Sequence, residues 1–65
     1  MAKYKQVTEK RILQVVVNKT KPKNKGLFIA KETATDGYIV CDNTQQEAFT
    51  EVFADKNQAV KWLLD

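Results

Sequence analysis

The stretch Tyr38-Ile-Val-Cys-Asp-Asn-Thr-Gln-Gln-Glu-Ala-Phe-Thr-Glu-Val-Phe53 decides the fold of this 65-residue chain, because its secondary-structure signals agree with one another. Two runs rich in β-branched and aromatic residues, which suit a pleated and half-buried surface, flank a polar segment of turn residues. The polar segment contains no glycine, which disfavours a tight two-residue turn and favours a loop of about 3–5 residues. The stretch therefore predicts a β-hairpin.

A helix after this hairpin is predicted to end the sequence. Asp55 is typical of an N-cap, and Gln58, three residues later, completes a capping-box pattern. Apolar residues then recur at helical spacing: Ala59, Val60, Leu63 and Leu64. Because an isolated helix of this length is marginal in water, we expect it to pack on the sheet, with Trp62 as its main anchor.

The segment 7–18 fits two different structures. As a strand, it has one apolar face formed by Leu13, Val15 and Val17. As a helix, it is capped by Thr8 and has an apolar stripe formed by Ile12, Val15 and Val16. We favour the strand, because the three consecutive valines 15–17 lose side-chain freedom in a helix.

The remaining segments complete the expected fold. Residues 27–30 are apolar and predict a further strand, and Asp36-Gly37 marks the turn that follows it. The fold class is thus α+β, with residues 1–65 forming one domain. It is an antiparallel meander of three to four strands followed by one C-terminal helix packed on the sheet.

Several of these strands are apolar on both faces, which has a consequence for assembly. One terminal helix covers only one face of a sheet, so the other face must be covered by a second subunit or by a strong bend of the sheet itself. The sequence therefore favours a protein that associates with itself or with a protein partner.

Charge is distributed unevenly along the chain. Residues 1–25 carry eight basic side chains and one acidic side chain, whereas residues 26–65 carry three basic and seven acidic ones. The segment 18–26, Asn-Lys-Thr-Lys-Pro-Lys-Asn-Lys-Gly, alternates lysine with other residues and is expected to form an exposed, self-repelling loop. The candidate residues for binding nucleic acid or an acidic partner are Lys19, Lys21, Lys23, Lys25, Lys10 and Arg11.

Binding of nucleic acid through this lysine-rich loop is the alternative function. The lysines could follow phosphates, and Phe28 or Tyr38 could stack on bases if exposed. If 8–17 is a helix, the order of helix, three strands and helix resembles double-stranded-RNA-binding domains. The basic cluster that opens the last helix of those domains is absent here, because Asp55-Lys56-Asn57-Gln58 offers one lysine.

Composition argues against an enzyme, and no cofactor, metal or small-molecule substrate is expected. The chain has no histidine, and its single cysteine, Cys41, neither forms an internal disulfide nor holds zinc alone. Asp42 beside Cys41 would raise the thiol pKa rather than activate it, so a structural role is favoured. The lone cysteine and the lack of a signal peptide or membrane-length apolar run indicate a cytoplasmic protein.

The last third of the sequence resembles short uncharacterised proteins of Gram-positive bacteria and their phages. The resemblance rests on three segments: 38–43, Tyr-Ile-Val-Cys-Asp-Asn; 48–53, Ala-Phe-Thr-Glu-Val-Phe; and 59–63, Ala-Val-Lys-Trp-Leu. It implies a strand pair followed by a helix, and an accessory protein that acts by binding. The sequence as a whole thus predicts a small non-enzymatic binding module that self-associates and engages a protein partner.

Overall fold

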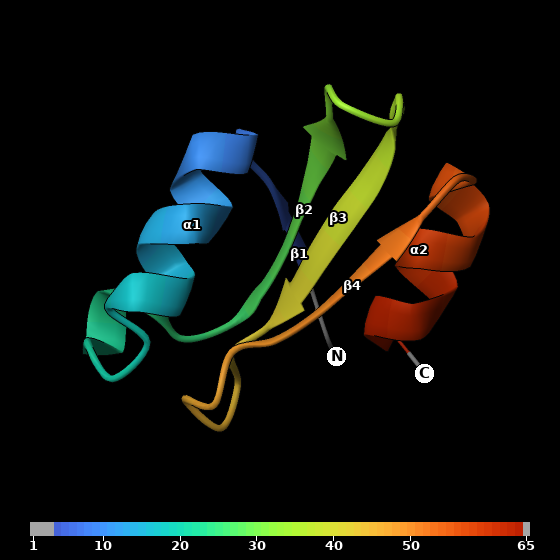
Figure 1. Cartoon of the computed structure of the whole chain (residues 1–65). Coiled ribbons are helices and arrows are strands. Elements are labelled where there is room, and N and C mark those ends of the chain that lie inside the picture. Colours follow the sequence, from blue (N-terminus) through green and yellow to red (C-terminus); the bar gives the residue numbers. More distant parts are fainter. Residues whose placement is uncertain (1–3, 65) are drawn as a thin grey trace.

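A four-stranded sheet lies between two helices in the computed structural model, which describes residues 4–64 (Figure 1). The elements are β1 (Tyr4–Gln6), α1 (Glu9–Val17), the 3₁₀ helix η1 (Pro22–Asn24), β2 (Leu27–Glu32), β3 (Gly37–Asp42), β4 (Phe49–Phe53) and α2 (Lys56–Leu64). The strand order is β1-β2-β3-β4; β1 runs parallel to β2, and the other neighbours are antiparallel. The α+β class and the C-terminal helix are as predicted, but the sheet is mixed and not a purely antiparallel meander.

The segment 7–18 contains the helix α1, which spans Glu9–Val17, so the predicted strand is wrong. Thr8 caps α1 by accepting a hydrogen bond from the Arg11 backbone N–H at 3.2 Å. Ile12 and Val15 are buried against the sheet, whereas Leu13 and Val17 are 60% and 79% exposed. Burying an Ile or Val side chain contributes about 1.5–3 kcal/mol, more than the helix propensity of up to about 0.7 kcal/mol that each valine costs.

The two helices cover opposite faces of the sheet (Figure 1). On the α1 face, Ile12 and Val15 pack with side chains from the neighbouring strands: Phe28, Ala30 and Cys41. On the α2 face, Ala59 and Leu63 pack with Leu27, Ile29 and Val40. The sequence analysis expected one apolar face of the sheet to need a second subunit or a bend. Helix α1 covers that face instead, over β2 and β3.

The hairpin and the last helix follow the sequence prediction, except that the loop between the strands is longer than the expected loop of about 3–5 residues. β3 and β4 pair in register from Tyr38 opposite Phe53 to Asp42 opposite Phe49, across a loop of residues 43–48. Asp55 caps α2, since its carboxylate accepts from the Asn57 backbone N–H at 2.8 Å. Trp62 is half-buried and packs against the core on the α2 face, where Ala59 and Leu63 are the buried residues of the helix.

Candidate functional site

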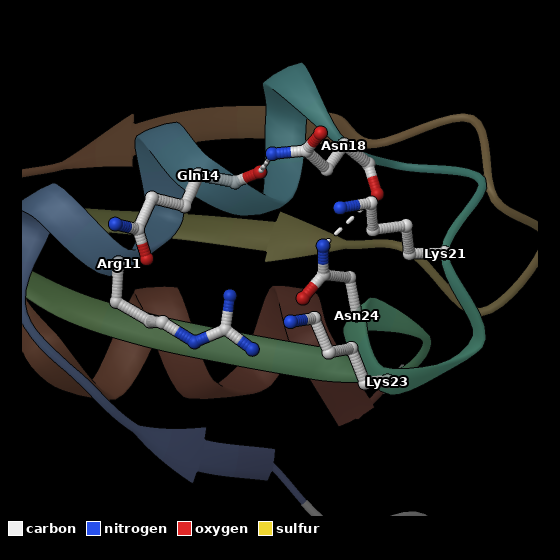
Figure 2. Close-up of a pocket in the computed structure, with 6 residues that line it drawn as sticks. All are labelled: Arg11, Gln14, Asn18, Lys21, Lys23 and Asn24. Carbon is white, nitrogen blue, oxygen red and sulfur yellow. Dashed lines mark hydrogen bonds between the residues drawn. The ribbon is translucent and has the colours of Figure 1, made fainter.

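A polar cavity of about 440 Å³ lies between α1 and the lysine-rich loop (Figure 2). It brings together three of the six cations predicted from the sequence: Arg11, Lys21 and Lys23. The other lining residues are three amides: Gln14, Asn18 and Asn24. Arg11, Gln14 and Asn18 come from successive turns of one side of α1 and its C-cap. The cavity therefore exists because the segment 7–18 folds as a helix.

The other three predicted cations lie outside the cavity lining. Lys19 and Lys25 are exposed and belong to the same loop as Lys21 and Lys23, so they add positive charge near the cavity. Lys10 is exposed on α1, next to Arg11 in sequence. The predicted residues thus divide into three that share one cavity and three that surround it or lie farther along the helix.

The loop backbone is fixed by the buried side chain of Asn43, which begins the β3–β4 loop. The Asn43 Nδ2 donates to the backbone oxygens of Lys19 at 3.0 Å and Asn24 at 2.8 Å. Its Oδ1 accepts from the Ala48 backbone N–H at 2.9 Å. Its backbone N–H donates to the Gly26 oxygen at 2.7 Å. A single residue therefore connects both ends of the lysine-rich loop to the sheet.

Further hydrogen bonds order the rest of this loop. The Gln46 Nε2 donates to the Thr20 oxygen at 2.8 Å, and the Asn24 Nδ2 donates to the Asn18 oxygen at 2.9 Å. Pro22 stands at the start of η1, where its missing N–H costs nothing. The lysine side chains are exposed as predicted, but their backbone is ordered. A preordered loop loses less conformational entropy when it binds a ligand.

Arg11 is positioned by an aromatic ring. Its Cζ lies 5.7 Å from the centroid of Phe28, within the range of a cation–π interaction. Phe28 is itself 2% exposed beneath α1, so the prediction that it could stack on bases is wrong. Tyr38, the other predicted stacking residue, packs half-buried on the opposite, α2 face. Phe28 therefore supports the Arg11 cation and is not exposed for stacking.

The cavity is strongly electropositive. Its six lining side chains are three cations and three neutral amides. Within residues 4–64, the ion pair that the structure forms joins Lys31 and Asp36, at 3.3 Å, and none involves a cavity cation. Like charges gathered without acidic partners repel one another, so an anion bound among them relieves this repulsion as well as forming new contacts.

Cys41 and the acidic residues do not form a second site of this kind. Burial raises the pKa of the Cys41 thiol to about 11, with a smaller contribution from the Asp42 carboxylate. Burial, and not Asp42 as the sequence suggested, is the larger cause. Among the described residues, no three Cys, Asp or Glu side chains gather as metal ligands would. Cys41 is a buried core residue, as its structural interpretation predicted.

Comparison with known proteins adds no further constraint on the site. No family model, curated protein or solved structure matches the chain. In the part of the chain that the structure describes, neither α1 nor α2 has the length and apolarity needed to cross a bilayer.

Four residues of the site were not among those singled out from the sequence: Gln14, Asn18, Asn24 and Asn43. Asn24 and Asn43 stand in polar segments where asparagine is typical of turns, and nothing in such a segment distinguishes a solvated amide from a buried one. Gln14 becomes a candidate only if 7–18 is a helix, because it then lies one turn from both Arg11 and Asn18.

Proposed function

We propose that this protein is a non-enzymatic module that binds the phosphate backbone of nucleic acid through the cavity between α1 and the lysine-rich loop. The observation that supports this function best is the convergence of Arg11, Lys21 and Lys23, from two separate elements, on one cavity, where none of the three forms an ion pair with another described residue. Cationic side chains facing a groove are the common means of binding phosphates. The lone buried thiol fits a role in the reducing cytoplasm.

The geometry also favours a compact anion over a flat acidic protein surface. Arg11 is half-buried and held over Phe28, and Figure 2 shows its guanidinium beside the end of Lys23. A planar guanidinium binds two phosphate oxygens at once, while lysines act as point charges beside it. A phosphate has oxygens on all sides and can meet Arg11, Lys21 and Lys23 together.

A charge-matched pair of variants tests the proposal. The double variant K21Q/K23Q should weaken binding of a fluorescent single-stranded oligonucleotide at least tenfold at low salt, because two of three phosphate contacts are lost. The control K56Q/K61Q removes the same charge from exposed positions of α2, on the other face. Fluorescence anisotropy gives the affinities, and circular dichroism confirms that both variants fold. Equal weakening by the two variants would mean that net charge, and not the cavity, governs binding.

Self-association is a second candidate, supported by exposed apolar side chains. Three of them lie on α1: Leu13, Val16 and Val17. A fourth, Val52, lies on β4, an edge strand of the sheet. Val52 pairs with Ile39, so it is on the α1 side of the sheet but beyond the strands that α1 covers. Exposed edges and apolar patches favour pairing with a second copy.

Light scattering after size-exclusion chromatography tests this second candidate. The wild-type protein should elute as a dimer at high concentration, and Val52→Lys should shift it to a monomer. A wild-type mass of one chain at every concentration would eliminate the homodimer and leave the nucleic-acid function unaffected.

A further inference from the structure

The side chain of Asn24 contains a buried hydrogen-bond acceptor without a donor. Asn24 is 2% exposed, and its Nδ2 donates to the Asn18 oxygen at 2.9 Å. Its backbone groups are also satisfied, by Lys21 and Asn43. Its Oδ1, in contrast, has no hydrogen-bond partner among the described residues. Such an atom loses its bonds to water on folding without replacing them, which destabilises the folded state unless a ligand supplies a donor.

The orientation of this amide is determined by its neighbours. Exchanging the oxygen and nitrogen of Asn24 would place Oδ1 against the Asn18 carbonyl oxygen, and two acceptors repel each other. The exchange would therefore lose one hydrogen bond without gaining another. The unpartnered atom is an oxygen, so the missing partner is a donor.

This oxygen is shielded from water in the unbound protein but faces the cations of the cavity, so a ligand reaches it when a surrounding side chain moves. Figure 2 shows Asn24 Oδ1 turned away from Asn18 and towards the ends of Lys23 and Arg11. A phosphate bound there cannot satisfy Oδ1, because phosphate oxygens are acceptors at neutral pH. The cavity thus combines cations for an anionic group with an acceptor for a donor close to that group.

We propose that the ligand is RNA, and that a ribose 2′-hydroxyl donates to Asn24 Oδ1 while the adjacent phosphate binds Arg11, Lys21 and Lys23. This inference rests on the proposed phosphate-binding function. In a ribonucleotide, the 2′-hydroxyl stands on the carbon next to the one that carries the 3′-phosphate, so one unit offers both groups. Deoxyribose lacks the hydroxyl, which is the group by which proteins distinguish RNA from DNA.

The size and composition of the cavity agree with one nucleotide of a single strand. Its volume of about 440 Å³ lies within the range of roughly 300–1,000 Å³ for sites that hold small ligands. Gln14 adds a further amide to the wall beside Arg11 (Figure 2). An amide offers a donor and an acceptor together, which suits the mixed groups of a sugar and a base.

Three oligonucleotides of one sequence test the proposal: single-stranded RNA, its 2′-O-methyl form and DNA. The wild-type protein should bind RNA at least about fivefold more tightly than either of the others at fixed salt, because only RNA supplies the donor. Equal, salt-dependent binding of all three would overturn the proposal and leave phosphate binding intact; Lys23 would then satisfy Asn24 Oδ1 itself. Binding that K21Q/K23Q leaves unchanged for every oligonucleotide would contradict the phosphate function and this inference together.

The variant Asn24→Ala tests whether a preference for RNA depends on the Asn24 side chain. It should bind RNA and 2′-O-methyl RNA equally, and a preference that persists would overturn the proposal. If Asn24→Ala does not fold, the side-chain amide resonance of Asn24 in the wild-type ¹H–¹⁵N spectrum provides the test. It should shift more on addition of RNA than of 2′-O-methyl RNA, and equal shifts would overturn the proposal.

Discussion

Replacing Asn43 by alanine should loosen the lysine-rich loop and destabilise the whole domain. The Asn43 side chain is fully buried and makes three hydrogen bonds, to the Lys19 and Asn24 oxygens and from the Ala48 N–H. Each bond contributes about 1 kcal/mol net, so their loss should lower the free energy of unfolding by about 3 kcal/mol. A core of this size supplies roughly 3–5 kcal/mol, so most of the stability would be lost.

Urea unfolding followed by Trp62 fluorescence measures this change. Trp62 is half-buried, and its ring centroid lies 6.4 Å from that of Phe53, so its emission should report on unfolding. For a slope of about 1–3 kcal/mol/M, the midpoint should fall by about 1–3 M. The control Asn57→Ala removes an exposed amide from α2 and should change the free energy by less than about 0.5 kcal/mol. A loss below about 1 kcal/mol for Asn43→Ala would refute the role assigned to this side chain.

Two further predictions concern the α1 face and the buried thiol. Ile12→Ala should lower the free energy of unfolding by about 2–5 kcal/mol, whereas Leu13→Ala should lower it by less than about 0.5 kcal/mol, because only Ile12 is buried against the sheet. Urea unfolding measures both changes. Similar losses for the two variants would support the strand interpretation instead. For Cys41, with its folded pKa of about 11 against an ordinary 9.0, the folded state retains a proton that the unfolded state releases, so stability should fall as pH rises from 9 to 11. Urea unfolding of Cys41→Ala over this pH range should not show this fall in stability. An identical pH dependence in the wild-type protein and the variant would contradict the raised pKa of Cys41.

How much of the fold could be predicted from the sequence depended on whether local and tertiary preferences agreed. They agreed from Tyr38 to Phe53 and at the Asp55 cap, and there the prediction was right apart from the length of the loop between the two strands. They disagreed at Val15-Val16-Val17, where side-chain entropy favoured a strand by a few tenths of a kcal/mol per residue. The burial of Ile12 and Val15 on the sheet reversed that preference. No pattern within 7–18 indicates that this segment packs on an apolar face of a sheet formed by later residues.

For the candidate site, the sequence predicted the charged residues but not their arrangement in space. The cations were evident in the sequence, because lysines alternate through 18–26 and Arg11 precedes them. Their convergence was not, because it requires α1 to lie against β2 and Asn43 to hold the loop from a distant segment. A hydrogen bond between residues 24 apart in sequence leaves no local trace, so the site could be predicted as a list of charges but not as a cavity.

The salt dependence of oligonucleotide binding tests the central claim, that three converging cations form a phosphate-binding cavity, most directly. For about three phosphate contacts, the logarithm of the affinity of the wild-type protein for a single strand should fall linearly with the logarithm of salt concentration, with a slope near −2. The slope for K21Q/K23Q should be shallower, between about −1 and zero, because one cation remains. A wild-type slope near zero, or no measurable binding at low salt, would contradict the claim.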